Sequence, residues 1–174
     1  MFLMNLNSEN ITFIIVSYRS EKIIEECLKT LPKRSNKIII ENSQNIELQK
    51  HLETKYDNIE VIISENIGMG AANNLGLKRC KTQFGYVINP DVRFNINTID
   101  VIIESLKLVN DFAILSPFNG NEKNPNYLIK KNYKNINQNI ISVDHVDGFS
   151  LLINKEKFKD DVYFDENFFF IPRK

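Results

Sequence analysis

The sequence predicts an α/β domain in which a mostly parallel sheet is flanked by helices. Short apolar runs rich in β-branched residues alternate four times with segments that carry apolar residues at helical spacing. The runs are apolar at nearly every position, which is typical of strands buried on both faces of a parallel sheet. Polar residues follow three of these runs directly, as expected where parallel strands end at a ligand-binding edge.

The first half of the chain supplies three pairs of a strand and a helix. The predicted elements are, in order, 11–16, 23–31, 37–40, 46–54, 61–63 and 71–80. Pro32 ends the first helix, because proline cannot continue the backbone hydrogen bonding of a helix. Small residues between Gly68 and Gly76 open the third helix. They would let that helix pack closely on the sheet.

The stretch 84–92 combines a strand with a sharp corner. Val87 and Ile88 are apolar and favour β structure, while Pro90 fixes its own φ angle and keeps Asn89 extended. Asp91 is therefore expected at the carboxyl end of this strand. The remaining predictions are a helix over 98–109, a strand over 112–115, a long solvated loop over 119–139, strands over 140–146 and 151–153, and a helical turn over 155–158.

Composition favours an ordinary globular domain without affinity for nucleic acid. The chain has 174 residues, 43% of them hydrophobic, and 22 basic residues balance 22 acidic ones. There is no apolar run of about 18 residues, and no basic region of a signal peptide precedes the first strand. We therefore expect a cytoplasmic protein. Cys27 and Cys80 lack metal or redox spacing and are expected to be buried free thiols.

A small basic cluster, Lys130, Lys131 and Lys134, lies within the predicted loop. We interpret it as solvated surface, as most such clusters are. The alternative is contact with an anionic acceptor or with headgroups at the inner face of a membrane. The sequence does not indicate an oligomeric state.

The polar residues that follow the strands form three clusters. They are Ser17-Tyr18-Arg19, Glu41-Asn42-Ser43 and Asn89-Pro90-Asp91. Because parallel strands end at the same edge of a sheet, we expect the clusters to converge there. Asp91 offers a carboxylate to Mg²⁺ or Mn²⁺, ions that take one or two protein carboxylates and complete their shells with waters and substrate phosphates. Such an ion would neutralise a diphosphate leaving group.

The glycines Gly68 and Gly70 suggest a second interpretation, a Rossmann-type dinucleotide binder. The pattern fails the dinucleotide fingerprint, because Asn73 stands where the third glycine is required and the stretch follows the third strand instead of the first. The chain contains no Walker pattern either. The loop can still direct backbone N–H groups at a phosphate from the start of a helix.

Five stretches, 11–31, 37–43, 66–76, 87–92 and 147–169, together resemble the inverting GT-A glycosyltransferases of the large family that includes bacterial rhamnosyltransferases. The most specific matches are the motif around 66–76 and Asn89-Pro90-Asp91, which resembles the metal-binding Asp-x-Asp motif with Asn in first place. The resemblance implies a single GT-A domain over 1–174. It also implies transfer of a sugar from a UDP- or dTDP-linked donor to a saccharide or lipid-linked acceptor in cell-surface polysaccharide or lipopolysaccharide biosynthesis.

The same resemblance implies roles for individual residues. Asp91 would hold Mg²⁺ or Mn²⁺ on the diphosphate, and Glu41 would take the place of an acidic residue, more often Asp, that contacts the base or ribose. Gly148 and Phe149 would lie on the acceptor side. The residues implied to contact the donor are Ser17, Tyr18, Glu41, Asn66, Gly68, Asn74 and Asn89.

The sequence departs from the family pattern near its C-terminus. The family's Glu-Asp-x-Asp type motif, which supplies the catalytic base, and the helices after it are expected beyond Phe169, but the 174 residues do not contain them. Asp147 is the remaining candidate for the base, although a turn aspartate beside Gly148 is the preferred interpretation. Two possibilities stay open at this point: an active glycosyltransferase, or an inactive remnant that binds a nucleotide sugar.

Overall fold

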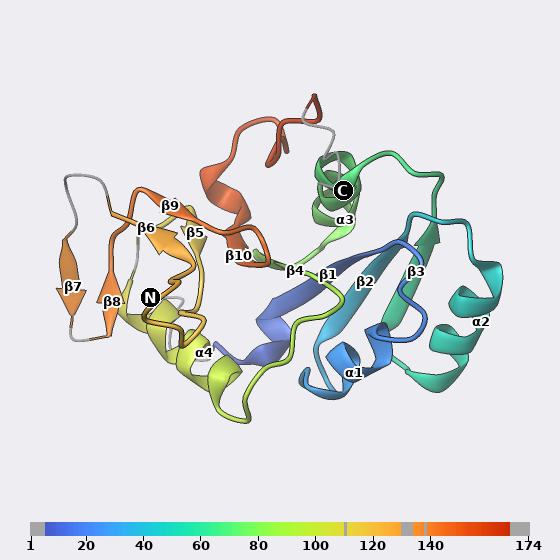
Figure 1. The fold of residues 1–174 in the computed structure, drawn as a ribbon, viewed down its shortest axis with the longest axis horizontal. Coiled ribbons are helices and arrows are strands. Elements are labelled where there is room, and N and C mark those ends of the chain that lie inside the picture. Colours follow the sequence, from blue (N-terminus) through green and yellow to red (C-terminus); the bar gives the residue numbers. More distant parts are fainter. Residues whose placement is uncertain (1–5, 110, 130–133, 138, 168–174) are drawn as a thin grey trace.

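The computed structural model describes residues 6–109, 111–129, 134–137 and 139–167. At its centre lies a six-stranded sheet (Figure 1). The strand order is β3 (Ile59–Ile63), β2 (Asn36–Glu41), β1 (Ile11–Ser17), β4 (Phe84–Ile88), β10 (Ser150–Asn154) and β5 (Ile114–Leu115). β1 to β4 are parallel, and β10 runs antiparallel to both of its neighbours. The predicted, mainly parallel sheet is confirmed.

Helices flank the sheet on both faces, as predicted. Three helices pack into one core cluster: α1 (Ile24–Lys29), α2 (Ile46–Lys55) and α4 (Thr98–Leu108). The opposite face is covered by α3 (Met69–Arg79) (Figure 1). Alternate residues of β1 serve the two cores, because successive side chains of a strand point to opposite faces. Phe13 and Ile15 belong to the first cluster, and Ile14 belongs to the cluster under α3.

The close approach of α3 to the sheet depends on one small residue. A Cβ atom added at Gly76 would lie 2.4 Å from Cγ2 of Ile14 on β1. Glycine at this position therefore lets the helix come nearer than a larger residue would permit. The prediction that small residues allow close helix packing is confirmed.

The region after β5 contains more structure than the sequence predicts. β6 (Tyr127–Leu128) pairs with β9 (His145–Val146), and β7 (Asn135–Asn137) pairs with β8 (Ile140–Ile141). Figure 1 shows these two small sheets on the β5 side of the main sheet. The predicted loop over 119–139 is therefore wrong in part. The predicted strand over 140–146 is wrong as a single element, because its two halves pair with different partners.

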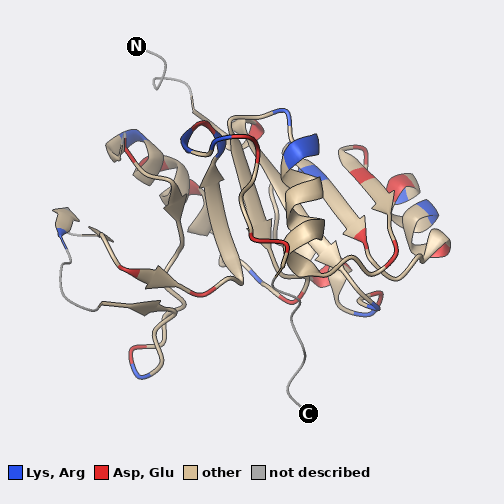
Figure 2. Ribbon diagram, turned by 90° about the horizontal axis from the view of Figure 1, so that it is seen from above, with Lys and Arg blue, Asp and Glu red and all other residues tan. Residues whose placement is uncertain are grey.

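The remaining elements are two short 3₁₀ helices, η1 (Ser8–Asn10) and η2 (Lys155–Lys157), and the second is close to the predicted helical turn. Cys27 and Cys80 are buried free thiols, as predicted. No helix in the described part of the chain is long and apolar enough to span a membrane. Figure 2 shows acidic and basic residues mixed over the outer helices and loops. Lys130 and Lys131 lie outside the described residues.

Candidate functional site

The three polar clusters meet at one edge of the sheet. β1 lies between β2 and β4, and all three strands run in the same direction. Ser17 at the end of β1 lies in register with Glu41 at the end of β2, and Asn89 directly follows β4. The expected convergence at the carboxyl ends of the strands is therefore observed.

Three buried polar atoms at this edge have no hydrogen-bond partner within the described structure: Ser17 Oγ, Glu41 Oε2 and Asn42 Oδ1. Glu41 is fully buried, and its other carboxylate oxygen accepts hydrogen bonds from the main-chain N–H of Ser43, at 2.8 Å, and from the Ser43 hydroxyl. Buried polar atoms without partners are rare, because each one costs free energy of desolvation. Three together indicate a place where a polar ligand supplies the missing partners.

A turn before α3 closes one side of this edge. The main-chain N–H of Gly68 donates to Asn66 Oδ1 at 3.2 Å, and Gly68 has a φ angle of 83°, which glycine adopts without strain. The side-chain amide of Asn42 reaches the carbonyl oxygen of Gly68 at 3.5 Å. Asn66 and Gly68 therefore lie beside the β2 end of the edge. Tyr18, which is 46% exposed, lies after β1 at the same edge.

Asp91 lies in the corner that follows β4. The main-chain N–H of Val92 donates to the carbonyl oxygen of Asn89 at 3.1 Å and closes the turn. The Asp91 carboxylate is exposed and makes no hydrogen bond or ion pair within the described part of the chain. A hard, unpartnered carboxylate at the edge fits a divalent ion that takes its other ligands from water and phosphate. No group of three or more possible metal ligands occurs among the described residues.

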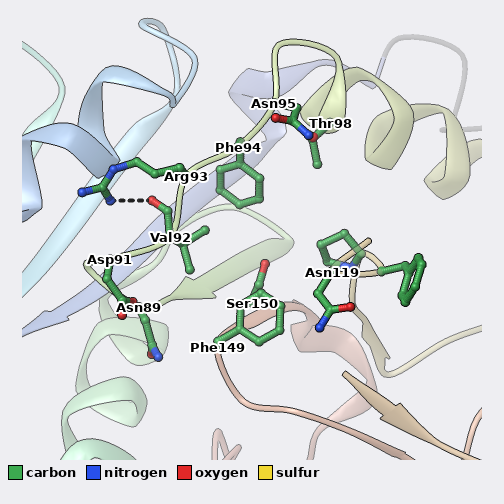
Figure 3. A pocket seen from close by; sticks show the side chains of 12 residues that line it. Asn89, Asp91, Val92, Arg93, Phe94, Asn95, Thr98, Asn119, Phe149 and Ser150 are labelled. Carbon is green, nitrogen blue, oxygen red and sulfur yellow. Dashed lines mark hydrogen bonds between the residues drawn. The ribbon is translucent and has the colours of Figure 1, made fainter. Parts of the chain in front are cut away.

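A pocket of about 390 Å³ begins at Asn89 and Asp91 and extends away from the buried polar atoms. Parts of the segments 89–98, 117–119 and 149–150 line it (Figure 3). The main-chain N–H of Asn89 donates to the carbonyl oxygen of Phe149 at 2.9 Å. The structure thus joins Phe149 to the Asp91 corner. Asp147 and Gly148, just before it, are exposed, and a Cβ atom at Gly148 would meet nothing within 4 Å.

The sequence matches the pattern of the protein family described as "Glycosyl transferase family 2" over residues 12–172. This match covers most of the chain. The chain belongs to glycosyl transferase family 2.

The sequences of the individual relatives have low identity to this chain. The low-salt glycan biosynthesis hexosyltransferase Agl10 of Haloferax volcanii is 24% identical over 180 residues, which cover 92% of this chain and 58% of the relative. Among solved structures, residues 1–349 of TarS from S. aureus match with a TM-score of 0.66 and 18% identity, over 90% of this chain and 50% of that fragment. TarS has also been solved in complex with UDP, and that structure matches with a TM-score of 0.63.

A mannosyltransferase, PcManGT from Pyrobaculum calidifontis, was solved in complex with GDP-Man and Mn²⁺. It matches with a TM-score of 0.62 and 12% identity, over 84% of this chain and 45% of that one. This chain thus spans about half the length of the relatives that it matches. The structural matches show the GT-A fold, which confirms the predicted fold class. Membership of a rhamnosyltransferase subgroup stays a prediction.

Asn74 has a structural role in this family 2 domain that the sequence did not reveal. Its Oδ1 accepts hydrogen bonds from the main-chain N–H groups of Tyr163, at 3.2 Å, and Phe164, at 2.9 Å. Its Nδ2 donates to the carbonyl oxygen of Phe164 and to Glu166 Oε1, both at 2.8 Å. The side chain, buried in α3, thus anchors the segment 163–166. The role of Asn74 as a donor contact stays a prediction.

Asn126 is a second residue that sequence reasoning missed. It is 2% exposed, and its side chain donates to Ser116 Oγ at 3.2 Å and to the carbonyl oxygen of Pro117 at 2.9 Å. Its Oδ1 accepts from the N–H of Asn119 at 2.9 Å, and its carbonyl oxygen accepts from the N–H of Asp147 at 2.8 Å. Asn126 therefore holds one wall of the pocket against the segment that leads to β10.

Proposed function

We propose that residues 1–174 form the donor-binding domain of a metal-dependent, inverting glycosyltransferase. The reaction would transfer a sugar from a nucleotide-diphosphate sugar to a saccharide or lipid-linked acceptor in the synthesis of a cell-surface polysaccharide. The observation that carries the proposal is the set of unpartnered buried atoms of Ser17, Glu41 and Asn42 beside Asp91 at one sheet edge. Membership of family 2 and the hexosyltransferase relative support it.

In this proposal each side chain at the edge has one task. Ser17 and Glu41 hydrogen-bond the nucleoside, which gives their buried oxygen atoms the partners that they lack. The carboxylate of Asp91 binds Mg²⁺ or Mn²⁺, which stabilises the negative charge of the diphosphate leaving group. The nucleotide and the ion found with TarS and PcManGT support these two assignments.

The acceptor hydroxyl would attack the anomeric carbon from the pocket beside Asp91. The new carbon–oxygen bond forms as the bond to the diphosphate breaks, and the hydroxyl proton passes to a base. Asp147 is the candidate base within the described residues, because it is exposed and lies two residues before Phe149 at the pocket. The enzyme requires access to nucleotide sugars, so we propose a site of action in the cytoplasm, at the inner face of the membrane for a lipid-linked acceptor.

Titration calorimetry with UDP, dTDP and GDP, each with and without Mn²⁺, tests the proposal. We expect at least one nucleotide to bind in the presence of Mn²⁺, and Asp91→Asn to weaken this binding at least tenfold. Asp57→Asn is the matched control, because Asp57 is exposed and lies before β3, away from the site. Binding that is equal with and without Mn²⁺, or binding of nicotinamide cofactors instead, would refute the proposal.

A further inference from the structure

Two side chains of α2 bind the backbone at the outer edge of the central sheet. In the described sheet β3 has a strand partner on one side only, and α2 lies beside it (Figure 1). Glu53 Oε1 accepts a hydrogen bond from the main-chain N–H of Val61 at 2.9 Å, and Gln49 Nε2 donates to the carbonyl oxygen of Val61 at 2.8 Å. Side chains therefore occupy one donor and one acceptor of the edge strand.

These two hydrogen bonds lie at the middle of the open edge. Alternate residues of a parallel strand bond to the same neighbour. The N–H of Ser64, directly after β3, donates to the carbonyl oxygen of Glu41 on β2, so the even-numbered residues of β3 bond to β2. The main-chain groups of Ile59, Val61 and Ile63 consequently point away from the sheet. Within the described residues, those of Ile59 and Ile63 have no hydrogen-bond partner.

The open edge is complementary to a second copy of itself. In an antiparallel pair, two residues that stand opposite each other exchange both of their N–H to C=O hydrogen bonds. With Val61 opposite Val61 of a second copy, Ile59 stands opposite Ile63, and all the outward-facing groups find partners. Glu60 stands opposite Ile62, so the two carboxylates do not face each other. The two copies are then related by a two-fold axis at Val61, the symmetry of most protein dimers.

The composition of β3 favours such pairing. Four of its five residues, in the sequence Ile-Glu-Val-Ile-Ile, are apolar and β-branched, and it contains no proline. An open strand of this kind pairs with other chains unless something covers its edge. The bonds from α2 occupy the groups of Val61, which would make the central pair of hydrogen bonds between two copies.

We propose that Gln49 and Glu53 form an edge guard that prevents two copies of this protein from pairing through β3. Gln49 supplies the donor and Glu53 the acceptor that an adjacent strand would otherwise offer to Val61. Their spacing of four residues puts both on the same side of α2, so a single turn of helix carries the whole guard. The guard keeps two sheets from joining into one continuous sheet.

Sedimentation equilibrium over a range of protein concentrations tests the proposal. The double variant Gln49→Ala/Glu53→Ala should form dimers with a dissociation constant at least tenfold below that of wild type. Adding Ile63→Pro should reverse this gain, because proline removes an outward N–H and leaves the bonds to β2 in place. Lys50→Ala/Glu54→Ala is the matched control, since both of its residues are exposed on the same helix at the same spacing.

Hydrogen exchange of the Val61 amide locates the contact. In the double variant this amide should exchange faster than in wild type at low protein concentration, because it has lost Glu53. Its exchange should slow again as the concentration rises and dimers form. An amide that stays unprotected in the dimer would place the contact at another surface and overturn the proposal.

Three further results would contradict the edge guard. One is association of the double variant no stronger than that of wild type, at an unchanged melting temperature. Another is a dimer that persists with Ile63→Pro, and the third is equal association of the Lys50→Ala/Glu54→Ala control. If the double variant unfolds, the single changes Gln49→Ala and Glu53→Ala decide, because each frees one group of the strand, and wild-type association in both overturns the proposal.

Discussion

The main-chain N–H of Asn89 and the carbonyl oxygen of Phe149 form a hydrogen bond of 2.9 Å across the carboxyl end of β4 and the start of β10. β10 runs antiparallel to β4, so the chain enters β10 at the edge where β4 leaves the sheet. This arrangement places a residue of the proposed metal corner in direct contact with a residue of the proposed acceptor pocket. This hydrogen bond extends the pairing of β4 with β10 by one residue beyond each strand and joins the two parts of the site.

Glu41→Gln is predicted to weaken nucleotide binding while the fold is retained. The substitution removes the charge of a fully buried carboxylate whose Oε2 lacks a partner. A hydrogen bond to a charged group contributes about 2 kcal/mol, so the affinity for the nucleotide should fall roughly 30-fold. Calorimetry measures this change, and Glu156→Gln, an exposed change in η2 at the opposite edge of the sheet, serves as the control. An unchanged affinity would show that Glu41 does not contact the nucleotide.

Asn74→Ala is predicted to release the segment 163–166 from α3. The change removes four hydrogen bonds of a buried amide, so the free energy of unfolding should fall by about 2 kcal/mol. Hydrogen exchange of the Tyr163 and Phe164 amides should accelerate more than exchange in β1. Gln83→Ala provides the control for an exposed amide. Uniform acceleration over the whole domain would show global destabilisation instead of a local anchor.

Gly76→Ala is predicted to destabilise the domain by about 2 kcal/mol, because the new methyl group would overlap Ile14 and force α3 away from the sheet. Urea unfolding measures the effect. Gly148→Ala is the matched control, since its methyl group would meet nothing within 4 Å and its stability should be unchanged. Equal stability of the two variants would contradict the close packing of α3 on β1.

The buried thiol of Cys27, whose Sγ lies 3.8 Å from the carbonyl oxygen of Asn89, predicts a pH dependence of stability. Burial raises the pKa of this thiol to about 12, from an ordinary value of about 8.5. Between these values the folded protein keeps a proton that the unfolded chain loses. The contribution of Cys27 to stability is therefore complete below about pH 8.5 and decreases as the pH rises toward 12.

The comparison of wild type with Cys27→Ala isolates this effect. The difference in their free energies of unfolding should shrink between pH 8 and pH 10.5, measured by urea unfolding at each pH. A difference that stays constant over this range would mean that the thiol ionises equally in both states. Between pH 6 and pH 8 the difference should not change, which provides an internal control.

The central sheet was predictable because the apolar pattern of each main strand is visible in its own sequence. β1 and β4 are apolar at almost every position and β2 contains three successive isoleucines, and such runs indicate burial on both faces without knowledge of the partner strands. The meeting of Ser17, Glu41 and Asn89 at one edge followed from that parallel arrangement. The residues of the edge could therefore be assigned before the structure was known, although their contacts with a donor stay predictions.

The short strands and the anchoring amides could not be predicted from local sequence. The alternating pattern over 140–146 shows an extended chain, but it does not specify that β8 pairs with β7 and β9 with β6. Asn74 resembles any other polar residue of a helix until its partners, about 90 residues away, are known. Asn126 is similar, because its burial depends on how the segments 116–119 and 147–150 come together.

The antiparallel pairing of β10 with β5 has a consequence for how such a protein can diversify. Leu115 and Leu152 are neighbours in the sheet, so the segment 116–149 leaves and re-enters the core at adjacent points. A segment that leaves and rejoins the sheet at adjacent points can be replaced by one of another length without moving β1, β2 and β4, which position Ser17, Glu41 and Asp91. Recombination at these two points would exchange the part of the pocket lining over 117–119 and at Phe149, while the strands that carry Ser17 and Glu41 stay in place.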